Sequence, residues 1–105
     1  MVNPDTVKAQ IEGGIIYGLT ATIKSSITIN EGQVEQSNFH NFPLLRMDET
    51  PKIEIHLVTS AESPGGVGEP PVPPIAPAVA NAVYAATGNR FRSLPIPSLD
   101  TMTNA

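Results

Sequence analysis

The chain has 105 residues and a formal net charge of −4, which is enough for one small domain with a modest core. Its six lysines and arginines are scattered, whereas nucleic acids and anionic membranes require a clustered basic surface, so we expect neither as a partner. The chain lacks cysteine, which excludes disulfides, thiolate catalysis and cysteine-held zinc or iron–sulfur clusters within it, and no apolar run approaches the roughly 18 residues of a membrane span.

Residues 3–22 have the pattern of a helix with one apolar stripe. Asn3 is a suitable N-cap, and Pro4 suits the first helical position. The stripe consists of Val7, Ile11, Gly14, Ile15, Gly18 and Ala21. Glycine in a helix interior costs up to about 1 kcal/mol relative to alanine, so its presence needs a reason. We predict a packed helix whose small residues let another backbone or a bulky ligand come close.

The middle of the chain predicts strands. Residues 25–39 indicate a hairpin with its turn at Asn30-Glu31-Gly32, and residues 40–51 an irregular crossing segment without a clean period. Apolar side chains alternate through residues 52–59, which predicts the clearest strand of the chain.

Proline and glycine divide the last third of the chain. Residues 60–74 hold five prolines and three glycines, a density that predicts a loop. Residues 75–87 predict an alanine-rich helix with Pro77 in its first turn and Gly88 as its stop.

The predicted fold class is α+β, with two apolar helices packed on a small, mostly antiparallel sheet of three to four strands. Residues 91–96 supply a short edge strand, and the tail 97–105 is expected to be frayed, within a single domain of residues 1–105. Both helices are unusually apolar for so small a domain, so we expect another chain, or a second copy through self-association, to cover their faces.

Glu69 is the first candidate for chemistry. Three glycines precede it within five residues, and Pro70 and Pro71 follow it. A proline restricts the residue before it to extended backbone, and glycines let the chain pass close to another object. A carboxylate held in such a loop is suited to act as a general base. The alternative is an ordinary solvated loop glutamate, which composition alone favours.

Other motifs carry weaker signals. Gln10 has a neutral amide that both donates and accepts hydrogen bonds, which suits a cofactor oxygen, although its spacing alone favours an ordinary polar surface position. The glycine-rich loop lacks the Gly-Lys-Ser/Thr ending of a phosphate-binding P-loop. The Pro70–Pro74 stretch fits a rigid connector better than a polyproline ligand. His40 and His56 have no carboxylates spaced for a metal site, so none is expected.

Three long strings resemble one known family. VNPDTVKAQIEGGIIYGLTATI, EQSNFHNFPLLRM and GGVGEPPVPPIAPAVANAVYAATGNRFRSLPI are similar, in this order, to the C-terminal part of the molybdopterin-binding large subunit of the xanthine dehydrogenase/aldehyde oxidase family. The branch with the isoquinoline 1-oxidoreductase beta subunit is the most similar. The resemblance implies a molybdenum-dependent oxidoreductase that hydroxylates N-heterocycles or oxidises aldehydes with a molybdopterin-type cofactor.

The resemblance also implies roles for individual residues. Glu69, in Val-Gly-Glu-Pro, corresponds to the general base of the family, and Gln10 and Gly68 correspond to cofactor contacts. The approach to the site would be lined, by a weaker correspondence, by Phe42, Leu44, Leu45 and Arg46. No residue of this chain is expected to bind the metal directly.

The expected partners are the remainder of the molybdopterin-binding subunit and an iron–sulfur subunit. Alone, the chain is expected to bind no molybdenum and to be inactive, because one base and one amide cannot enclose a large cofactor. We expect a soluble protein of the cytoplasm or the periplasm. The alternative reading is a non-catalytic structural or protein-interaction module derived from the same family.

Overall fold

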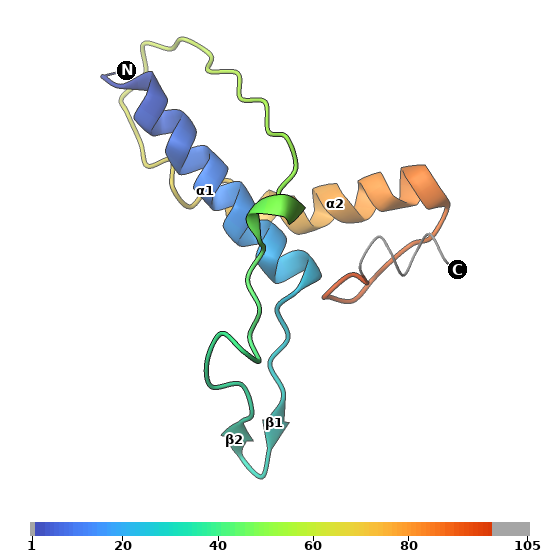
Figure 1. Ribbon diagram of the computed structural model, residues 1–105. Coiled ribbons are helices and arrows are strands. Elements are labelled where there is room, and N and C mark those ends of the chain that lie inside the picture. Colours follow the sequence, from blue (N-terminus) through green and yellow to red (C-terminus); the bar gives the residue numbers. More distant parts are fainter. Residues whose placement is uncertain (1, 98–105) are drawn as a thin grey trace.

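The computed structural model describes residues 2–97, an α+β arrangement of two crossing helices and one small hairpin (Figure 1). In chain order the elements are the helix α1 (Pro4–Ile23), the strands β1 (Ile29–Asn30) and β2 (Gln33–Val34), the short 3-10 helix η1 (Met47–Glu49) and the helix α2 (Val72–Thr87). The α+β class is confirmed. The hairpin projects away from the helices, and the segment after η1 arches back beside the first half of α1 (Figure 1).

The first helix begins and ends almost as its sequence predicts. The Asn3 side chain accepts a hydrogen bond from the Thr6 backbone N–H at 3.1 Å, so the first turn is capped. Pro4 occupies the first helical position, where no N–H is needed.

The small residues of α1 bring the second helix close. Gly14 and Gly18 are buried. A Cβ at Gly14 would stand 2.7 Å from the carbonyl oxygen of Gly68, and one at Gly18 would stand 3.1 Å from the Cβ of Ile75. Real Cβ atoms essentially never come within 3.0 Å of another atom, so only glycine permits the packing at position 14, and a Cβ at position 18 would make an unusually tight contact. The predicted close approach of another backbone is confirmed.

The second helix begins earlier than predicted. It starts at Val72, because Pro73 and Pro74 can lie in a first turn whose N–H groups have no helical partner. Pro77 consequently lies inside the helix and not in its first turn. Gly88 ends the helix as predicted, with a φ of 78° and its N–H donated to the Tyr84 carbonyl at 2.8 Å.

The hairpin is confirmed, although its paired strands are short. Ile29 lies opposite Val34 in the antiparallel pair. Glu31 and Gly32 have φ values of 50° and 77°, and two successive positive values are typical of the tight turn that suits hairpins. One further backbone hydrogen bond extends the hairpin, from the Glu35 N–H to the Thr28 carbonyl at 3.0 Å.

Two predicted strands are wrong, so the sheet has two strands and not three to four. Residues 52–59 keep their alternating burial, but no strand in the described part of the chain pairs with them. Residues 91–96 also form no strand, and their single backbone link to α1 runs from the Ile96 N–H to the Thr22 carbonyl at 2.7 Å. The predicted fraying of residues 97–105 falls, beyond Pro97, outside the described residues.

The chain buries little of itself. Among the described residues, Val83 and Ile96 are the buried hydrophobic side chains. The accessible surface is 8135 Å², against about 5,700 Å² for a folded monomer of this mass. The radius of gyration is 16.5 Å, where a compact chain of this length has about 13 Å. The helices therefore expose faces that a compact domain would cover.

Neither helix of the described residues is both long enough and apolar enough to cross a lipid bilayer.

We predict opposite effects for alanine at two adjacent glycines of α1. Gly14→Ala should lower the midpoint of thermal unfolding, because its Cβ would collide with the Gly68 carbonyl and the loss from such overpacking is about 1–3 kcal/mol. Gly13→Ala is the matched control, since a Cβ there meets nothing within 4 Å and helix propensity should add about 0.5–1 kcal/mol. Circular dichroism would follow the thermal unfolding of both variants. An equal rise in the midpoint for Gly14→Ala and Gly13→Ala would contradict the close packing at Gly14.

An ion pair fixes η1 to the end of α1. The Lys24 ammonium lies 2.6 Å from both carboxylate oxygens of Glu49, and the Arg46 backbone N–H donates to the same carboxylate at 3.1 Å. The hydrogen bond from Lys24 is the main reason that the pKa of Glu49 lies below its ordinary value.

The ion pair between Lys24 and Glu49 predicts that the stability of the folded chain depends on pH. Since the pKa of Glu49 is lower in the folded chain than in the unfolded one, its stabilising effect is present above the unfolded-state pKa and is lost as the pH falls through the folded-state pKa. Lys24→Met should raise the pKa of Glu49 in an NMR titration. Lys52→Met is the control, because the Lys52 ammonium lies 3.9 Å from the Glu54 carboxylate and does not contribute to the lowered pKa of Glu49. An unchanged Glu49 titration in Lys24→Met would rule out the ion pair.

Candidate functional site

A shallow hollow of about 370 Å³ lies between α1 and the segment that leads into α2. It brings together three of the residues that the sequence singled out, and its lining is Gln10, Gly13, Gly14, Tyr17, Gly68, Glu69 and Val72. The residues from α1 recur at intervals of three and four, so they share one face of the helix. Residues about 60 positions apart in the sequence thus meet at one place.

The backbone around Gly68 sets the position of Glu69. The Gly68 carbonyl packs where a side chain at position 14 would be, and the missing Cβ of Gly68 leaves room for the Gln10 amide, whose nitrogen would stand 3.3 Å from it. The Glu69 carbonyl accepts a hydrogen bond from the Val72 N–H at 2.9 Å. Both sides of Glu69 are therefore held, one against α1 and the other in the turn that starts α2.

The Glu69 side chain itself is exposed at the edge of this hollow. The ion pairs found within residues 2–97 join Lys24 to Glu49 and Lys52 to Glu54, and neither involves Glu69. Its carboxylate is thus available to an incoming group.

The other predicted site residues lie elsewhere. None of the four residues assigned to the approach, Phe42, Leu44, Leu45 and Arg46, lines the hollow that holds Glu69. Leu45 lines an apolar groove of about 650 Å³ between α1 and α2, whose charged members, Lys24 and Glu49, are paired with each other. Leu44 and Arg46 are exposed.

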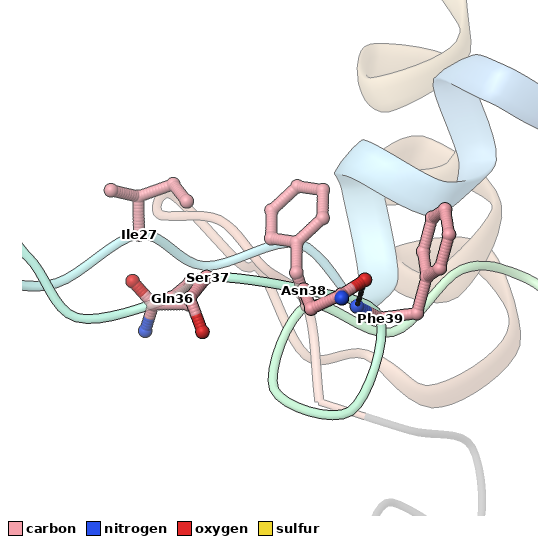
Figure 2. Close-up of a pocket in the computed structure, with 6 residues that line it drawn as sticks. Ile27, Gln36, Ser37, Asn38 and Phe39 are labelled. Atoms are coloured by element: carbon pink, nitrogen blue, oxygen red, sulfur yellow. Dashed lines mark hydrogen bonds between the residues drawn. The ribbon is translucent and has the colours of Figure 1, made fainter.

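Phe42 lines a separate hollow at the base of the hairpin, together with Ile27 and residues 36–39 (Figure 2). The Asn38 side-chain oxygen accepts a hydrogen bond from the Phe39 N–H at 2.8 Å, which turns the chain there (Figure 2). The lining contains no carboxylate, imidazole, ammonium or thiol. This hollow therefore lacks any group for acid–base chemistry.

Within the described part of the chain, no group of three or more histidine, cysteine, aspartate or glutamate side chains could hold a metal ion. The hollow is lined instead by one carboxylate, one amide, one phenol, one valine and the bare backbone of three glycines. Such a set can accept a proton and make hydrogen bonds to a polar edge.

Sequence reasoning missed Gly13, Tyr17 and Val72 as members of the site. The first two were accessible from the sequence, because they follow Gln10 at three and seven positions on the same helix face. Val72 was not, since its place depends on α2 beginning before residue 75.

Comparisons with known proteins agree with the resemblance. No protein-family model matches the sequence. The chain is 42% identical over 103 residues to the isoquinoline 1-oxidoreductase beta subunit of Brevundimonas diminuta, in a match that covers 97% of this chain and 13% of that protein. It is 38% identical over 97 residues to a nicotinate dehydrogenase subunit of Pseudomonas putida, in a match that covers 91% of this chain and 8% of that protein.

The fold of the chain is also similar to part of a known structure. A crystal structure of the Cu,Mo-CO dehydrogenase in its carbon monoxide reduced state matches with a TM-score of 0.76 and 28% sequence identity, covering 97% of this chain and 14% of that chain. Further relatives are xanthine dehydrogenase and aldehyde oxidoreductase molybdenum-binding subunits, and the chain spans about an eighth of the length of most of these proteins. The chain is therefore homologous, over nearly its whole length, to one segment of the molybdenum-binding subunits of the xanthine dehydrogenase/aldehyde oxidase family.

Proposed function

We propose that residues 1–105 form one unit of the C-terminal part of a molybdopterin-binding subunit, in an enzyme that hydroxylates N-heterocycles or oxidises aldehydes. In this proposal Glu69 is the general base, and Gln10 and Gly68 contact the cofactor. One observation carries it: Gln10, Gly68 and Glu69 line the same hollow, although a helix, a hairpin and a long loop separate them in the sequence.

The residues of the hollow fit the edge of a large cofactor. At Gly13 a Cβ would meet nothing within 4 Å, so a ligand can approach the helix backbone there. The Gln10 amide can donate to, or accept from, a polar cofactor edge without adding charge. When bound, the molybdenum cofactor supplies the redox chemistry. Glu69 then takes up a proton at a carboxylate oxygen, and the fixed backbone on both of its sides holds the Cα from which this side chain extends.

The remaining walls must come from other polypeptide. Ligand pockets usually bury most of a ligand's surface, whereas this hollow is shallow and its carboxylate exposed. The apolar faces of α1 and α2 offer the surface on which the rest of the subunit would pack. The chain has no cysteine, so an iron–sulfur partner that receives the electrons must provide its own cluster ligands.

The alternative is a non-catalytic module that only docks onto a partner. Its support is the set of large apolar side chains left exposed on the hairpin and the segment after it, namely Ile27, Ile29, Val34 and Phe39. Such a surface also favours self-association, which light scattering at several concentrations would detect. The two functions differ in whether Glu69 matters for turnover.

We predict that Glu69→Gln in the complete enzyme lowers kcat by about 10²–10⁴-fold while molybdenum content stays at the wild-type value, because the amide cannot accept the proton. Glu62→Gln is the matched control, since Glu62 is an exposed glutamate of the same loop outside the hollow. Steady-state kinetics and metal analysis are the measurements. Wild-type turnover in Glu69→Gln would refute the assigned role and favour the docking module.

We also predict that the isolated chain, expressed alone, contains no stoichiometric molybdenum. In the complete enzyme, Gln10→Ala should lower the molybdenum content, whereas Gln33→Ala, on the exposed hairpin, should not. Metal analysis of the purified proteins tests both statements. Full molybdenum occupancy of the isolated chain, or of Gln10→Ala, would contradict them.

A further inference from the structure

Tyr17 is a highly exposed aromatic residue in the lining of the hollow that contains Glu69. Its side chain is 71% exposed, although it is one of only five aromatic residues that the chain possesses, and it lines the same hollow as Glu69. The other tyrosine differs: the guanidinium carbon of Arg90 lies 4.0 Å from the centre of the Tyr84 ring. Tyr17 is thus the tyrosine whose ring is left open beside the candidate base.

The face of α1 between Gln10 and Tyr17 forms one side of this hollow. Seven residues of α-helix span about 10 Å, so the amide and the phenol mark two ends of a floor of that length. Midway along it, Gly13 has empty space where a side chain would project. The helix backbone is therefore bare at Gly13, with the Gln10 amide before it, the Tyr17 ring after it and Glu69 in the lining of the same hollow.

These dimensions and groups suit a flat ligand. A fused two-ring nitrogen heterocycle is flat and shorter than the about 10 Å that seven helical residues span, so it can lie along this helix face. Aromatic rings gain roughly 0.5–1.5 kcal/mol from stacked or edge-to-face contact beyond the burial of their area. An aliphatic group would gain less from the ring of Tyr17.

We propose that Tyr17 is a ligand-contacting residue of this site, whose ring packs against a planar nitrogen heterocycle held between Gln10 and Glu69. This inference rests on the proposed function and extends it. The heterocycle has two possible sources, the ring system of the cofactor or that of a heteroaromatic substrate. The shared chemistry is a flat ring with polar edges, and the two sources are separable by experiment.

The test uses the complete enzyme with Tyr17→Leu, which removes the ring, and Tyr17→Phe, which keeps it and removes only the hydroxyl. Tyr84→Leu is the matched control, since Tyr84 lies outside the hollow. The probes are isoquinoline, followed as a substrate or a competitive inhibitor, and acetaldehyde, which has no ring. Molybdenum content is measured on every sample.

If the ring contacts substrate, Tyr17→Leu should weaken the apparent affinity for isoquinoline about three- to tenfold and leave acetaldehyde kinetics and molybdenum content unchanged. If it contacts the cofactor, molybdenum content should fall, and kcat for both probes should fall in proportion. Tyr17→Phe should stay within about twofold of wild type in either case. Either pattern supports the proposal.

Two results would overturn it: Tyr17→Leu with wild-type affinity and molybdenum content, or Tyr84→Leu with the same losses as Tyr17→Leu. Tyr17→Gln, which also lacks the ring, should repeat the result of Tyr17→Leu and guards against poor folding of one variant. Glu69→Gln is assayed in parallel. If it keeps full turnover, the proposed function fails, whereas a loss in Glu69→Gln with an unaffected Tyr17→Leu means that only this inference fails.

Discussion

The contact between the Gly68 carbonyl and the bare backbone at Gly14 is the constraint on which the rest of the chain depends. It brings the loop that carries Glu69 against α1 at the height of Gln10. It also sets where α2 starts, because the turn that begins at Glu69 leads directly into that helix. One missing side chain therefore fixes both the crossing of the helices and the meeting of the candidate base with the candidate cofactor contact.

Around this contact the chain is loosely held. The buried apolar side chains of the described residues are few, and the surface exceeds that of a compact monomer by more than a third. The hydrophobic stabilisation available within the chain is correspondingly small. A segment that amounts to about an eighth of its relatives' length is expected to take most of its stability from the polypeptide around it.

Features that depend on adjacent residues could be predicted from the sequence, whereas contacts between residues far apart in the chain could not. The cap at Asn3, the turn at Glu31 and Gly32, and the stop at Gly88 each follow from the chemistry of a few adjacent residues. The strand predicted at residues 52–59 failed because alternation gives a strand its faces but not its hydrogen-bonded neighbour, which is absent from the described chain. Three residues that line the candidate hollow, Gln10, Gly68 and Glu69, were singled out from the sequence by their motifs, whereas Tyr17 joins them only when the whole helix face is considered.

The hydrogen bond from the Val72 N–H to the backbone carbonyl of Glu69 ties the backbone of this residue to the first turn of α2. Ile75 of α2 meets α1 at Gly18, so Glu69 lies on one side of the point where the helices cross and Thr87 lies on the other. A neighbouring polypeptide that changed the angle between the two helices would therefore move the backbone of Glu69 without touching it. The position of this acidic residue thus depends on how tightly α1 and α2 are packed together.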